Sequence, residues 1–168
     1  MNYINRFILA AALAPAIITS AMADTAVLVQ VTNNTSDTLK LKHLSVLPPD
    51  YPISDYDVSP NKLRNINIPF HRTFTYPTSG WQPTLRKIPP IQFNLTYEVN
   101  GHICQLSTHL EVHIIPGWSE PSYSPHWSKT VNASGNDNYS CKAVISQKMS
   151  EAPFSYTVNL TINENNPT

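Results

Sequence analysis

A short histidine-containing segment is the first place where the side chains could do chemistry. In a β-strand, residues two apart share a face, so His109, Glu111 and His113 would project together while Leu110 and Val112 face the core. Two imidazoles and a carboxylate can bind zinc or copper. Same-side positions are about 6.6 Å apart at roughly 3.3 Å per residue, so one ion on all three needs twist or a bulge. The alternative is an ordinary solvated strand face.

A second candidate site is the segment 115–129, which reads IPGWSEPSYSPHWSK. Trp118, Tyr123 and Trp127 stand there among three prolines, and this composition predicts an irregular, stiff loop. Aromatic rings held in this way suit a sugar face, a peptide or a membrane interface. Trp81, in the proline-rich stretch 77–90, would extend the same surface. The alternative is that the rings fold back and cover the core.

Catalytic motifs are weak in this chain. The run Gly117-Trp118-Ser119-Glu120-Pro121 begins like a nucleophile elbow, but proline stands where that motif needs its second glycine. The chain has four glycines, too few for a glycine-rich phosphate loop. We therefore expect a protein that is not an enzyme. A small exported hydrolase remains the alternative, because catalytic triads assemble from residues far apart in sequence.

The two cysteines predict one disulfide. Cys104 and Cys141 lie 37 positions apart, and their spacing matches no zinc motif. A single pair suits an exported protein, and closing this loop would stabilise the fold by about 4 kcal/mol. Both cysteines fall on predicted apolar strand faces, so we expect the bridge to lie in the core. The alternative is a free or metal-binding pair of thiols.

The first 23 residues have the pattern of a bacterial Sec-type signal peptide. Arg6 precedes an apolar run, and Ala21 and Ala23 provide small residues for a cleavage site that would leave Asp24 first. A membrane anchor is the alternative, but the run has about 12 residues and a span needs about 20. No later stretch is long enough to cross a membrane as a helix. We therefore expect residues 24–168 to form one periplasmic or secreted domain.

Alternating apolar and polar residues dominate the mature chain. A slip in the alternation predicts a β-bulge near Lys42 and His43. Asn100-Gly101 joins two alternating runs and predicts a type I′ hairpin. Its register would place these pairs on one mostly apolar face: Val99 with His102, Tyr97 with Cys104, Leu95 with Leu106, Phe93 with Thr108, and Ile91 with Leu110.

The fold class follows from these patterns. Outside the signal peptide, no stretch of ten or more residues shows a convincing helical period. About seven strands and long loops rich in proline and aromatic residues predict an all-β, antiparallel β-sandwich, immunoglobulin-like in architecture. The chain has 168 residues, which fits one domain, and its formal net charge is zero. Zero net charge argues against a nucleic-acid binder that tracks phosphates.

The sequence therefore predicts an exported binding protein that engages a protein, glycan or lipid partner through its aromatic loops. The alternative function is a periplasmic transition-metal-binding protein that holds zinc or copper on the His109, Glu111 and His113 face. No other cofactor is expected.

Overall fold

The computed structural model describes residues 24–47, 51–71, 87–118 and 121–165, and these form eight strands and one 3₁₀ turn. The expected signal peptide and Trp81 lie outside the described residues. The elements are β1 (Thr25–Asn34), β2 (Lys40–Leu44), η1 (Ile53–Tyr56), β3 (Leu63–Phe70), β4 (Lys87–Val99), β5 (His102–Ile115), β6 (Ser122–Gly135), β7 (Tyr139–Ser146) and β8 (Tyr156–Glu164).

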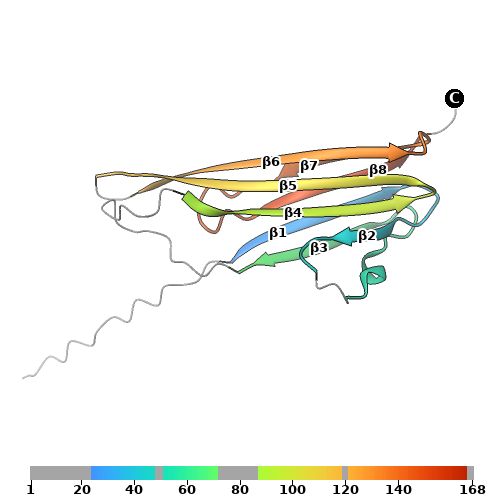
Figure 1. Ribbon diagram of the computed structural model, residues 1–168, viewed down its shortest axis with the longest axis horizontal. Helices are drawn as coiled ribbons and strands as arrows, with labels where there is room; N and C mark the ends of the chain where they lie inside the picture. The colour runs from blue at the N-terminus through green and yellow to red at the C-terminus, as the bar shows by residue number, and fades with distance from the viewer. Residues whose placement is uncertain (1–23, 48–50, 72–86, 119–120, 166–168) are drawn as a thin grey trace, which may run out of the picture.

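The strands form two sheets that face each other, as Figure 1 shows. One sheet has the order β3-β1-β8-β7, and the other has the order β2-β4-β5-β6. The described residues contain one 3₁₀ helix, η1, and no α-helix. No helix among them is long and apolar enough to cross a membrane. The predicted all-β sandwich is therefore confirmed at the level of its two layers.

The core lies between the sheets and comes from alternate residues of the strands. In β1 and β5 every second side chain is buried, as the period-two pattern predicts. Among the largest side chains that are completely buried are Phe93, Leu95, Tyr97, Leu106, Leu110, Phe154 and Leu160. Their burial is the main source of stability that holds the two layers together.

One strand pair departs from the predicted antiparallel arrangement. β1 pairs in parallel with β8, from Val27 opposite Tyr156 to Asn34 opposite Asn163, and antiparallel with β3 on its other side. The first and last strands of the domain are therefore neighbours in one sheet. Alternation of apolar residues says which face a residue takes but nothing about strand direction, so the sequence pattern could not reveal this pair.

The β4–β5 hairpin has the predicted register. All five predicted residue pairs, from Val99–His102 to Ile91–Leu110, are present. Asn100 and Gly101 both have positive φ, at 46° and 76°, as a type I′ turn requires. The predicted bulge is confirmed by a register shift between Leu41 and His43.

The predicted loop 115–129 is wrong from Ser122 onward. Residues 122–135 form β6, which pairs along its whole length with β5, from Ile115 opposite Ser122 to His102 opposite Gly135. β6 is the last strand of its sheet, and an edge strand tolerates Pro125 because one side of its backbone needs no ladder partner. Proline in this segment predicts a loop, but Pro125 lies in an edge strand instead.

Cys104 and Cys141 are joined, and their Cα atoms are 6.0 Å apart. Cys104 belongs to β5 and Cys141 to β7, so the bridge links the two sheets. Cys104 is 1% exposed, whereas Cys141 is only partly buried. The disulfide therefore closes the margin of the sandwich between β5 and β7, with one sulfur in the core and the other near the surface.

Candidate functional site

The segment between β5 and β6 carries the most exposed large hydrophobic side chain of the described residues. Trp118 is 96% exposed, and Ile115, at the end of β5, is 50% exposed. Ile115 ends a strand whose inner side chains are buried in the core, and Trp118 follows that strand by three residues. The sandwich therefore holds an indole ring in solvent at one of its ends.

The other two predicted aromatic residues lie elsewhere. Tyr123 and Trp127 stand opposite Ile114 and Leu110, on the inner face of β6. The ring of Tyr123 is 5.7 Å from the ring of Phe154, between centroids. The rings of Tyr123 and Trp127 both pack against the core and are partly buried. They form the wall of the sandwich at β6, which is the alternative that the sequence left open.

Trp127 has a polar atom without a partner. Its Nε1 is buried and has no hydrogen-bond acceptor among the described residues. The Nζ atom of Lys148 lies 5.6 Å from the centre of the ring, within the range of a cation–π contact. This arrangement anchors the loop after β7 to the wall of β6 and contributes to packing.

The predicted histidine face is present on β5. His109 Nε2 lies 3.7 Å from one carboxylate oxygen of Glu111, and His113 Nε2 lies 3.3 Å from the other. The side chains of His109, Glu111 and His113 are 38%, 25% and 48% exposed, respectively. Glu111 thus lies between two imidazoles, as the strand spacing predicted.

A third histidine, His126, joins this face from β6. It stands directly opposite Glu111, and its ring centre is 5.6 Å from that of His113. Its Nε2 lies 3.2 Å from Ser124 Oγ. The sequence pattern does not indicate His126, because the prolines of segment 115–129 predict a loop there. As the side chains stand, no three His, Cys, Asp or Glu residues in the described part of the chain are grouped so that they could hold a metal ion.

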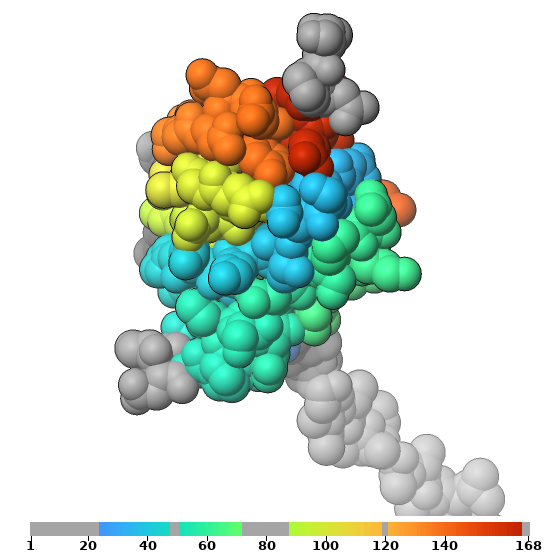
Figure 2. Space-filling model, turned by 90° about the vertical axis from the view of Figure 1, so that its right-hand side faces the viewer, coloured from blue at the N-terminus to red at the C-terminus, as the bar shows by residue number. Residues whose placement is uncertain are grey.

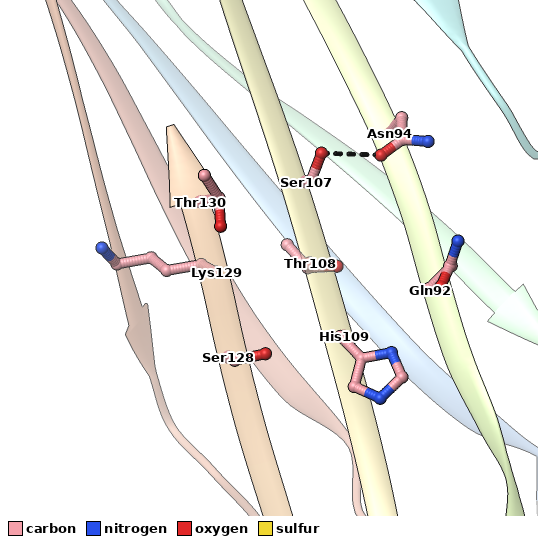
Figure 3. A pocket seen from close by; sticks show the side chains of 8 residues that line it. All are labelled: Gln92, Asn94, Ser107, Thr108, His109, Ser128, Lys129 and Thr130. Atoms are coloured by element: carbon pink, nitrogen blue, oxygen red, sulfur yellow. Dashed lines mark hydrogen bonds between the residues drawn. The ribbon is translucent and has the colours of Figure 1, made fainter. Parts of the chain in front are cut away.

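The same outer face is hollowed farther along the strands. The hollow measures about 220 Å³, and Figure 3 shows its lining side chains on three neighbouring strands. Ser107 Oγ donates a hydrogen bond of 2.7 Å to Asn94 Oδ1 across it. The lining residues are Gln92, Asn94, Ser107, Thr108, His109, Ser128, Lys129 and Thr130. Amides and hydroxyls predominate, so this surface can exchange hydrogen bonds with a polar ligand.

The elbow-like sequence is described only in part. Ser119 and Glu120 of the elbow-like sequence lie outside the described residues. Glu98, which is partly exposed, is bound to Lys42 with 2.7 Å between Oε2 and Nζ, and this hydrogen bond lowers the pKa of Glu98. Such a surface ion pair is a common structural feature.

Comparisons with known proteins give no further guide: no family model matches the chain, and no curated protein matches it.

Proposed function

We propose that the chain is an exported, non-enzymatic binding protein that contacts its partner at the β5–β6 turn, with Trp118 as the central contact. The observation that carries this proposal is the 96% exposure of Trp118. A large aromatic ring loses the benefit of burial when it stands in water. Tryptophan is also strongly enriched among the residues that dominate binding interfaces.

The surroundings of the turn support this function. β5 and β6 run beside each other from Ile115–Ser122 to His102–Gly135, so the turn sits at the end of a long paired ribbon. Tyr123 packs against Phe154 and ties the start of β6 to the core. The ends of both strands are therefore fixed before a partner arrives, which reduces the ordering entropy that binding costs.

The proposal of export rests on two features. Cys104 and Cys141 are paired, and structural disulfides persist mainly in oxidising compartments. Residues 1–23 have the composition of a cleaved signal peptide. We place the mature domain, 24–168, in the periplasm or outside the cell. The partner there is a protein, a glycan or a lipid surface.

A comparison of two single variants tests this function. Wild type, Trp118→Ala and Val144→Ala are applied to a glycan array, to vesicles of phosphatidylethanolamine and phosphatidylglycerol, and to envelope proteins from the host. Val144 is a matched control because it is 46% exposed on β7. We expect one class of partner to bind wild type and Val144→Ala equally and to lose at least tenfold affinity with Trp118→Ala. Equal binding by all three forms would contradict the proposal.

Metal binding is a second candidate function, and one observation favours it. His126 brings a third imidazole to the face that already holds Glu111 and His113. Binding would require these imidazoles to rotate toward a common point. Titration calorimetry with zinc chloride is the test. The double variant His113→Ala/His126→Ala should abolish binding, and His43→Ala on β2 should not; equal zinc binding by wild type and the double variant would exclude this site.

A further inference from the structure

A buried histidine lies against the disulfide at the end of the sandwich opposite Trp118. His102 is the first residue of β5 and is 4% exposed. Its Nδ1 is 2.8 Å from the backbone oxygen of Asn136, and its Nε2 is 3.4 Å from Cys141 Sγ. A carbonyl oxygen can only accept, so Nδ1 must carry the proton in this contact. In the neutral ring, Nε2 then presents its lone pair to the sulfur.

Three turns, 35–39, 100–101 and 136–138, meet at the end of the molecule where His102 lies, as Figure 2 shows. Asn100 donates through Nδ2 to the hydroxyl of Tyr139 at 2.8 Å and to Asp37 Oδ2 at 2.5 Å. The Tyr139 hydroxyl donates to the same Asp37 oxygen at 3.2 Å. The Tyr139 ring centre is 5.9 Å from that of His102. The imidazole thus contacts the backbone oxygen of Asn136 and the sulfur of Cys141, and it lies beside the Tyr139 ring.

The acidic side chains at this end take part in the hydrogen bonds between the turns. Asp37 accepts the hydrogen bonds just described, and Glu164, at the end of β8, accepts from the backbone and hydroxyl of Ser36 in the same turn. Both are carboxylates. Asp37 and Glu164 thus hold the turns at this end together.

The two cysteines differ in access. Cys104 is 1% exposed and surrounded by the core, where a thiolate is disfavoured. Cys141 is partly exposed on β7, the edge strand of its sheet, and it has the imidazole as a neighbour. A thiol next to a histidine loses its proton more readily than a free one. When the pair is reduced, Cys141 is therefore the more reactive cysteine.

We propose that Cys141 is the site at which a disulfide-carrying oxidant enters, and that His102 accepts the Cys141 proton. The resulting thiolate attacks one sulfur of the oxidant, forms a mixed disulfide and expels one thiolate. Cys104 then loses its proton to that expelled thiolate and attacks Cys141 Sγ. The second oxidant sulfur leaves as a thiolate and takes the proton from His102. Two protein thiols are oxidised, and the oxidant gains two electrons and two protons.

Alkylation of single cysteines is the first test. Cys104→Ala leaves Cys141 alone, and iodoacetamide labelling is followed by mass spectrometry from pH 5 to pH 10. We expect the pH midpoint for Cys141 to lie at least one unit below that of an ordinary cysteine, about 8.5. Adding His102→Gln should restore the ordinary midpoint and slow labelling about tenfold at pH 6.5. Adding His113→Gln, at the other end of β5, is the matched control and should change nothing.

Trapping of the mixed disulfide is the second test, and it uses the unmutated cysteines. Reduced wild type is mixed with glutathione disulfide, quenched with acid and mapped by peptide mass spectrometry. We expect glutathione on Cys141 and slower formation of the disulfide in His102→Gln. Glutathione on Cys104, an equal distribution over both cysteines, or unchanged kinetics in His102→Gln would each overturn the proposal. A reduced chain that unfolds gives the equal distribution and so counts against it.

Discussion

At one end of the sandwich, three turns are bonded to one another and a disulfide lies just inside them; at the other end, the β5–β6 turn carries an exposed tryptophan. The first end holds Asp37, Asn100 and Tyr139 in one hydrogen-bond network. The second exposes Trp118 and half of Ile115. The cross-linked turns and the exposed tryptophan thus lie at opposite ends of the same strands.

This difference indicates how a small sandwich can present an apolar group without weakening its fold. Interactions that constrain the chain most, such as a cross-link, do not need to lie near the group that binds. A change at the bonded end should therefore alter stability, and a change at the exposed turn should alter binding. The predictions below test this separation, from the largest expected effect to the smallest.

Removal of the disulfide should have the largest effect. Cys104→Ala/Cys141→Ala frees a loop whose ends lie 37 positions apart, and the free energy of unfolding should fall by about 4 kcal/mol. Urea denaturation followed by circular dichroism measures the change. Binding to the partner should persist in whatever fraction remains folded. A loss below about 1 kcal/mol would show that the bonded end does not depend on its cross-link.

Gly135→Ala should have the next largest effect. Gly135 has φ of 95°, and a Cβ atom there would collide with the backbone oxygen of Gly101 in the facing turn. Strain and collision together should cost about 3 kcal/mol. Gly101→Ala is the matched control: its φ is also positive, but its Cβ would meet nothing within 4 Å. The control should cost about 1 kcal/mol, and equal losses would mean that the turns are not closely packed.

Truncation of Trp127 separates the wall from the exposed turn. Trp127→Ala should lower the free energy of unfolding by about 2 kcal/mol, because its partly buried ring packs against the core. Trp118→Ala should change stability by less than about 0.5 kcal/mol, because its ring is 96% exposed. Thermal and urea unfolding of both variants provide the comparison. Equal losses would show that Trp118 also packs against the fold.

An alkaline titration tests how well the core near the bonded end excludes water. Burial raises the pKa of Tyr97 above its ordinary value, and its hydroxyl donates to the backbone oxygen of Tyr56 at 2.7 Å. The Tyr97 hydroxyl ionises at lower pH in the unfolded chain than in the folded one. The stability that its buried, neutral form provides is therefore complete below about pH 10 and is lost as the pH rises. Between pH 9 and pH 11, the free energy of unfolding of Tyr97→Phe should fall by about 1 kcal/mol less than that of wild type. Parallel curves would mean that Tyr97 is accessible to water.

The sequence predicted the β4–β5 hairpin in detail, and the reason is local. Asn100 and Gly101 specify a turn that fixes the register, and any slip by one residue would move apolar side chains to the solvent face. The bulge at Leu41–His43 was predicted for the same reason, since the alternation itself changes phase there. These features are encoded by residues that are neighbours along the chain.

The candidate site was predicted less completely. The shared face of His109, Glu111 and His113 follows from strand geometry alone. The separation of Trp118 from Tyr123 and Trp127 did not, because proline made β6 resemble a loop. His126 was missed with that strand. Composition could not distinguish an edge strand that tolerates proline from an irregular segment.

The amino-acid sequence by itself determined which residues of β1, β4 and β5 face the core, the turn at Asn100-Gly101, and that two cysteines would pair. Tertiary structure alone decided that β1 lies parallel to β8, that β6 pairs with β5 as an edge strand, and that His102 contacts Cys141. The physical reason is range. Alternation and turn geometry act between near neighbours, whereas strand order and the contacts of side chains depend on segments that meet only when the two sheets close.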